Sequence, residues 1–411
     1  MDFEGWNRLA RLREHIARIG LWALVAVLAI RGVPFLADAA VRPSHGFVAY
    51  YTASRLVAEG ADSAHFYDDV WFKAQMKRYG LAADDVHINP PATNLLLLPL
   101  VGLDYTSARV IWTIFNLVIL AGAVTWILWQ TGLRSVWIPA CIAFVLMFEP
   151  LYANFYLGQA YVLVLGLLVA AWHAVRHQRD RSVGVSLGLA LILKLAGVFV
   201  WLLLLIRRCW TALAWTAGAA LAIVVVSLPW LGLNAWFAYA QVVAGLSAQP
   251  ERAVTAYQTT LGFFLHLFTF DEKWNLAPLV HSPLLGTLLP WLAFAALVGV
   301  SVYRVHRTRQ TDLAFSGFVI LGVILSPLSL DYHYVVLLLP AAILVTWARE
   351  RRRLWVWCVL VVALAFVAAD LPYRSPALTE GARSLLAYPK LYGALMLWSL
   401  SMWGCDHSVK A

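Results

Sequence analysis

A single lysine, Lys194, interrupts one of the most apolar stretches of the sequence and is the first residue that could do chemistry. It stands in the middle of VGVSLGLALILKLAGVFVWLLLLI (183–206). A charge there is costly unless it faces water or a counter-charge. An ammonium group at this depth suits the binding of a phosphate at a membrane. The alternatives are snorkelling or an ion pair with a buried carboxylate, although no acidic residue lies within two helical turns.

A second group of polar residues lies in ILSPLSLDYHYVVLLLP (324–340), between two apolar runs. Asp331 and His333 could bind sugar hydroxyls or activate a hydroxyl as general bases. Ser329 is a further polar contact in the same turn. Because Ser and Asp also cap free backbone N–H groups at helix junctions, the spacing alone leaves both interpretations open.

Two more polar residues stand at the starts of predicted helices. Gln159 follows Gly158 in FEPLYANFYLGQAYVLVLGLL (148–168). Its amide could donate to a phosphate or sugar oxygen, or be incidental. Arg109 begins an apolar run and could meet a lipid phosphate, although anchoring among headgroups is the preferred interpretation.

The loop over residues 40–91 contains three further candidates. His45 comes just after the first apolar run, where a lone histidine is usually incidental. Asp68 could simply cap a helix that begins there. Tyr51 belongs to FVAYYTASRLVA (47–58), whose periodicity indicates a helix with aromatic residues lying flat at the membrane surface.

Membrane helices must position these residues. Of 411 residues, 62% are hydrophobic and only 13% are charged, against about 25% charged in soluble domains. This composition excludes a soluble enzyme, a disordered chain and a small disulfide scaffold. A span needs about 20 apolar residues. The stretches of suitable length are roughly 19–38, 106–130, 136–151, 157–175, 209–231, 284–303, 313–329, 333–348, 354–370 and 388–404.

Residues 183–206 are expected to form two short helices that meet near Lys194 and return to one side of the membrane. The sequence therefore predicts an all-α polytopic membrane protein, one integral domain over residues 1–411, with about twelve membrane helices. The run 92–103 is too short to span and is expected to be a re-entrant or interfacial helix. Residues 66–80 are expected to form an amphipathic helix.

Lys and Arg gather in the segments that share a side with both termini. By the positive-inside rule that side is cytoplasmic, so we expect a plasma (bacterial inner) membrane protein with its active site on the outer face. The large loops 40–91 and 232–283 then lie outside. Scattered basic clusters do not favour nucleic acid as a partner. A cleaved signal peptide is the competing interpretation of the N-terminus, but its removal would spoil the charge balance.

Several segments, taken in order, carry a family resemblance that covers about residues 16–350. They are GFVAYYTASRLVAEG…FYD (46–68), NPPATNLLLLPL (89–100), Gly158–Gln159, GLALILK (188–194) and SPLSLDYHYVVLLLP (326–340). Together they resemble glycosyltransferase family 87, a group of GT-C-type membrane enzymes.

The resemblance implies a hexosyltransferase that moves a sugar, with mannose favoured, from a polyprenyl-phosphate donor to a lipid or glycan acceptor. No cofactor and no metal site is expected, although acidic outer loops would permit a divalent ion. A base must deprotonate the acceptor, and cations must stabilise the leaving phosphate. Lys194 fits the second role. His333, Gln159, Tyr51, Arg109 and Ser329 are the further candidates for substrate binding.

The chain departs from the family pattern at one position. The pattern usually begins the first external helix with Asp-Phe, whose Asp is the expected base, whereas this chain has Gly46-Phe47. His45 could replace that Asp, another carboxylate could do so, or the protein is not catalytic. The other carboxylates considered are Asp62, Asp68 and Asp331.

Two alternative functions follow from this departure. One is a non-catalytic binding or scaffold protein on the same fold. The other, less favoured, is a lipid or sugar transporter, because no second interrupted helix matches 183–206 as an internal repeat would require.

Overall fold

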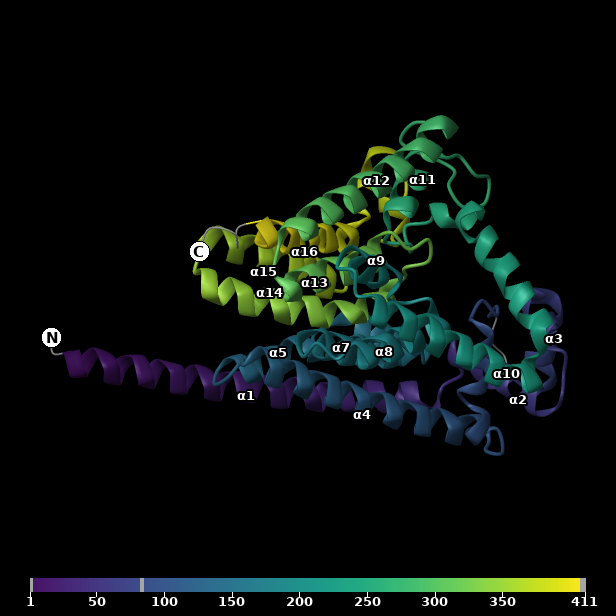
Figure 1. Ribbon diagram of the computed structural model, residues 1–411, viewed down its shortest axis with the longest axis horizontal. Helices are drawn as coiled ribbons and strands as arrows, with labels where there is room; N and C mark the ends of the chain where they lie inside the picture. The colour runs from purple at the N-terminus through teal and green to yellow at the C-terminus, as the bar shows by residue number, and fades with distance from the viewer. Residues whose placement is uncertain (1–2, 82–84, 407–411) are drawn as a thin grey trace.

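The computed structural model describes residues 3–81 and 85–406 of the protein, and this part of the chain is almost wholly helical (Figure 1). The four longest helices are α1 (Phe3–Val41), α4 (Tyr105–Thr131), α10 (Trp210–Gly245) and α12 (Pro283–Arg307). Apart from one isolated bridge between Asp271 and Asn275, no β-structure occurs in the described residues.

The remaining α-helices are shorter. They are α2 (Phe47–Ala58), α3 (Asp69–Arg78), α5 (Trp137–Leu146), α6 (Glu149–Leu157), α7 (Tyr161–Arg176), α8 (Asp180–Lys194), α9 (Val198–Ile206), α11 (Thr260–Phe268), α13 (Thr311–Ile324), α14 (Leu338–Arg351), α15 (Leu354–Ala368) and α16 (Pro389–Asp406). Among the short 3-10 turns, η2 (Pro91–Leu95), η3 (Leu98–Leu100) and η6 (Asp331–Leu337) matter for the site.

Several helices have the length and the apolar composition needed to cross a lipid bilayer. Five helical stretches in the described residues are long and apolar enough to cross a membrane, or six if α5 and α6, bent by 48°, form one broken span. The predicted class, an all-α polytopic membrane protein, is therefore confirmed. The count of about twelve membrane helices stays a prediction, because α7, α13 and α15 are apolar but shorter than a full span.

The helices are arranged around two groups of buried side chains. In Figure 1, α1 and α4 run along one side, α12, α14, α15 and α16 lie on the other, and α7 and α8 lie between them. The larger core is centred on α7, α13, α14 and η6. The smaller core surrounds α2 at the far end of the molecule, where α3 also lies. The start of α1 and the end of α16 lie at the opposite end.

The break predicted near Lys194 is present. Helix α8 ends at Lys194 because Leu195 turns into the left-handed region (φ 50°), and Gly197 (φ 82°) does the same before α9 begins at Val198. Left-handed residues end helices by letting the next N–H groups reach back to free carbonyls. Here the Ala196 N–H donates to the carbonyl of Ala190 at 3.2 Å.

Three details differ from the sequence expectations. The aromatic residues of α2 are buried in the smaller core rather than lying at the membrane surface, and Tyr50 is fully buried. The run 92–103 forms two short 3-10 helices, η2 and η3, rather than one continuous helix, and Pro99 in the middle of the run has no backbone N–H to donate. Helix α10 continues past the expected end to Gly245, with a kink at Gly232.

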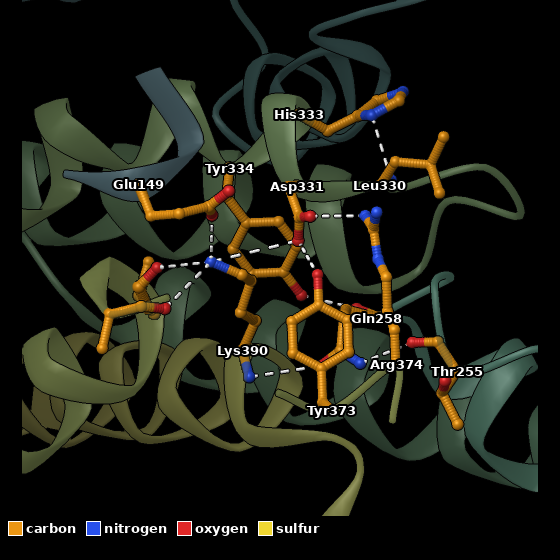
Figure 2. A network of polar contacts seen from close by, with 12 residues as sticks. Glu149, Thr255, Gln258, Leu330, Asp331, His333, Tyr334, Tyr373, Arg374 and Lys390 are labelled. Carbon is orange, nitrogen blue, oxygen red and sulfur yellow. Dashed lines mark hydrogen bonds and ion pairs between the residues drawn. The ribbon is translucent and has the colours of Figure 1, made fainter. Parts of the chain in front are cut away.

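The C-terminal helix is fixed to the rest of the bundle by a buried lysine. Figure 2 shows Lys390 of α16 pointing between Glu149 and Asp331. Its Nζ donates to Glu149 Oε2 at 2.6 Å and to the carbonyl of Val367 at 3.3 Å, and it lies 3.9 Å from Asp331 Oδ1. The Lys390 side chain is only 1% exposed, so these groups replace the water it loses on folding. The network therefore joins α16 to α6, α15 and η6.

Replacing Lys390 with methionine keeps the length of the side chain and removes its charge. We expect the variant to lose about 3–5 kcal/mol of stability, because Glu149 and Asp331 keep their charges without the ammonium between them. The measurement is the thermal unfolding midpoint in detergent. Arg78→Met, which breaks only contacts of an exposed side chain with Glu59 and Tyr79, should leave the midpoint almost unchanged. A Lys390→Met midpoint equal to that of Arg78→Met would contradict the assignment.

Candidate active site

Lys194 lies at the centre of a cluster of polar side chains from three separate segments. Its Nζ donates to Asn89 Oδ1 at 2.7 Å and to Gln159 Oε1 at 3.1 Å. The rings of Tyr50 and Tyr161 lie 4.8 and 5.4 Å from the ammonium. Among the described residues Lys194 forms no ion pair. Its direct hydrogen-bond partners are therefore neutral oxygens, and its positive charge can still attract an anion.

Gln159 reaches Lys194 because of a second helix break. Gly158 (φ 68°) ends α6 in the left-handed region, and the Gln159 N–H donates back to the carbonyl of Asn154 at 3.0 Å. The Gln159 side chain then turns inward, and its Oε1 also accepts the hydroxyl of Tyr50 at 2.7 Å. Two neighbouring helix ends, after α6 and α8, thus deliver the amide and the ammonium to one point.

This point lies in a cavity of about 500 Å³. One part of its wall is polar and includes His45, Asp85, Asn89, Gln159, Lys194, Ser326, Ser329 and His333. The other part is apolar and includes Leu168, Leu195, Val198, Phe199, Val200, Val319 and Val323. The cavity can therefore hold a ligand with a charged head and a hydrocarbon tail.

Five of the residues predicted from the sequence line this cavity: His45, Gln159, Lys194, Ser329 and His333. The Ser329 hydroxyl is buried and, within the described part of the chain, has no hydrogen-bond partner. His333 Nδ1 accepts the N–H of Leu330 at 3.0 Å, and its ring packs 4.3 Å from that of Tyr161. A free hydroxyl and an oriented imidazole are suitable groups for recognising a polar ligand.

Four predicted site residues lie outside the cavity. Asp68 caps α3 by accepting the N–H groups of Val70 and Trp71. The Tyr51 hydroxyl donates to the carbonyl of Leu103 at 2.6 Å. These contacts favour structural roles.

Arg109 and Asp331 are the other two. The guanidinium of Arg109 is buried and donates to the carbonyls of Phe155 and Tyr156 at the end of α6. A positive charge at this C-terminal end interacts favourably with the helix dipole. Asp331 accepts from Tyr373 and Arg374 in the network of Figure 2. Both side chains thus hold elements together, although the buried Nε of Arg109 has no hydrogen-bond partner among the described residues.

Sequence reasoning missed two residues of the cavity wall, Asp85 and Asn89. Asn89 was part of a quoted motif, NPPATNLLLLPL, but its contact with Lys194 depends on how the loop folds. Asp85 is one of many acidic residues in the loop 40–91, and no spacing distinguishes it. Burial raises the pKa of the Asp85 carboxyl. The carboxylate accepts hydrogen bonds from the N–H groups of Gly46 and Val86, and these bonds make the rise in pKa smaller.

Gly46 has no room for a side chain. Its φ is +88°, which favours glycine. A Cβ added there would lie 2.4 Å from Gln159 Nε2 and 2.8 Å from the carbonyl oxygen of Leu157. The packing of α2 against the α6–α7 junction therefore requires glycine at position 46.

A Gly46→Ala variant should lose about 1–3 kcal/mol of stability and also displace the Gln159 amide from Lys194. The expected result is a lower thermal unfolding midpoint together with weaker binding of a prenyl-phosphate ligand. Gly60→Ala is the matched control, because Gly60 also has a positive φ (+77°) but nothing within 4 Å of the added Cβ. Equal effects of the two substitutions would contradict the crowding at Gly46.

Within residues 3–81 and 85–406, no three His, Cys, Asp or Glu side chains converge as metal ligands would. Catalysis without a metal ion stays a prediction from the sequence.

Comparison with known proteins places the chain in a family. The model of Glycosyltransferase family 87 matches residues 87–329. Two curated relatives carry the name polyprenol-phosphate-mannose-dependent alpha-(1-2)-phosphatidylinositol mannoside mannosyltransferase. The relative from Mycobacterium tuberculosis is 27% identical over 282 residues, or 64% of this chain and 62% of the relative. The relative from Mycolicibacterium smegmatis is 26% identical over 305 residues, or 67% of this chain and 65% of the relative.

These alignments thus span less than two thirds of either relative's length. No solved structure matches the chain. The family match alone covers more than half of the 411 residues and contains Asn89, Gln159 and Lys194. The chain therefore belongs to glycosyltransferase family 87.

Proposed function

We propose that the protein transfers a hexose, with mannose favoured, from a polyprenyl-phosphate donor to a lipid or glycan acceptor at the outer face of the membrane. The single observation that carries the proposal is the ammonium of Lys194, which is held by neutral oxygens in a cavity lined by both polar and apolar side chains. A prenyl-phosphate sugar has the matching order of parts, namely tail, phosphate and sugar.

The donor phosphate would bind to Lys194. Charge-assisted hydrogen bonds of this kind are stronger than neutral ones, and they strengthen further as the phosphate becomes the leaving group and gains charge. The prenyl chain would follow Val198, Phe199 and Val200 of α9. The sugar would face Ser329 and His333, two polar residues that line the cavity.

The choice of mannose and of a lipid acceptor rests on the printed names of the two relatives, which specify polyprenol-phosphate-mannose and phosphatidylinositol mannoside. Their modest identity makes these two features proposals for this chain. The outer-face location rests on the distribution of Lys and Arg along the sequence.

The test of the activity is a transfer assay with the full chain in liposomes. Labelled polyprenyl-phosphate mannose is supplied with a lipid extract containing phosphatidylinositol mannosides, and the labelled lipids are separated. We expect a new labelled lipid, absent from protein-free liposomes. Donors carrying glucose or arabinose test the choice of sugar. Donor binding without any transfer would instead indicate a non-catalytic relative, and no binding of any prenyl-phosphate sugar would refute the proposal.

Replacing Lys194 with methionine should lower kcat/KM for the donor by about 10²-fold or more, because a preorganised donor to the developing charge is lost. Lys77→Met is the control, since Lys77 is an exposed lysine of α3 in the same external loop and does not line the cavity. The comparison uses the same transfer assay with equal amounts of folded protein. Similar rates for both variants would argue against a phosphate site at Lys194.

A further inference from the structure

We infer that Asp85 is the general base of the transfer reaction and that it takes the place of the carboxylate missing at position 46. This inference rests on the proposed function, because it names the group that activates the acceptor. Asp85 lies in the loop between α3 and η2, and it is the one carboxylate among the described residues that line the cavity. The polar wall therefore offers one oxygen base of the required kind beside Lys194.

The backbone of Gly46 itself holds this carboxylate in place. The Gly46 N–H donates to Asp85 Oδ2, and the Val86 N–H donates to Asp85 Oδ1 at 2.8 Å. The carboxylate thus lies against the residue whose own side chain is absent. Because a Cβ at position 46 would collide with Gln159, a carboxylate can reach this place from the loop but not from α2.

The other candidate bases fit the cavity less well. Asp68 and Asp331 lie outside it and are occupied by a helix cap and by the Lys390 network. Asp62 also lies outside and accepts the N–H of Ala64 at 3.0 Å. His45 lines the cavity but is exposed to solvent. This position suits the transfer of a proton from Asp85 to water better than the deprotonation of an acceptor hydroxyl shielded from water.

The step balances without any further reactant. Asp85 takes the proton of the acceptor hydroxyl, and the oxygen electron pair forms the new bond to the anomeric carbon. The bond from that carbon to the donor phosphate oxygen breaks, and its electrons leave with the prenyl phosphate beside Lys194. Asp85 becomes a neutral carboxylic acid and then returns its proton to water.

The decisive variant is Asp85→Asn, which keeps the size and the acceptor oxygen but cannot take a proton. We expect kcat for mannosyl transfer to fall by about 10²–10⁴-fold, with the Kd for polyprenyl-phosphate mannose changed less than about threefold. Asp85→Glu restores a carboxylate and should recover part of the rate. Glu59→Gln is the matched control in the same external loop, because Glu59 pairs with Arg78 and Tyr79 away from the cavity.

The outcomes separate this inference from the proposed function. If wild-type protein transfers mannose but Asp85→Asn keeps a rate within about threefold, Asp85 is not the base. If His45→Ala abolishes transfer while Asp85→Asn does not, the base is His45. If Asp85→Asn loses donor binding together with transfer, and Asp85→Glu recovers neither, the carboxylate has a structural role and the inference fails. A wild-type protein that binds no prenyl-phosphate sugar would overturn the proposed function itself.

Discussion

The constraint on which the site depends is the cost of placing the Lys194 ammonium among apolar helices. The cost is offset by neutral groups, namely the side-chain oxygens of Asn89 and Gln159 and the faces of two tyrosine rings. Neutral partners lower the desolvation cost without cancelling the charge. These groups come from three parts of the chain, namely α2 (Tyr50), the loop before η2 (Asn89) and the α6–α7 junction (Gln159 and Tyr161). Stabilising one ammonium therefore requires the loop before η2, the α6–α7 junction and the end of α8 to meet.

Two other buried cations show the contrast. Lys390 is paired with Glu149, and Arg109 donates to the carbonyls that end α6. Both side chains bond to groups of neighbouring helices, and neither lines the cavity. They hold α16 and α6 in position, and α6 in turn positions Gln159. The buried charges of Lys390 and Arg109 thus hold helices together. The buried charge of Lys194 instead lines a cavity where it can bind a ligand.

The packing around Gly46 connects the arrangement of the helices to the polar residues of the cavity. A residue without a side chain lets α2 approach the α6–α7 junction, where Tyr50 can reach Gln159. The backbone N–H that this close approach exposes is the one that binds Asp85. The cavity therefore contains a carboxylate, Asp85, that comes from the loop between α3 and η2 and accepts the Gly46 N–H.

The sequence by itself determined the class of the protein and the positions of its helices. Apolar runs of span length, the break at Lys194 and the helices near 47–58 and 66–80 all follow from local composition and periodicity, which act over one or two turns. Lys194 and Gln159 could be selected because a polar group in an apolar run is costly wherever the chain goes. Only the tertiary structure decided that Asp85 joins them and that Asp331 does not, because those outcomes depend on contacts between segments far apart in the sequence. The burial of the α2 aromatics was decided in the same way, since an amphipathic pattern indicates that one face is covered but not whether lipid or protein covers it.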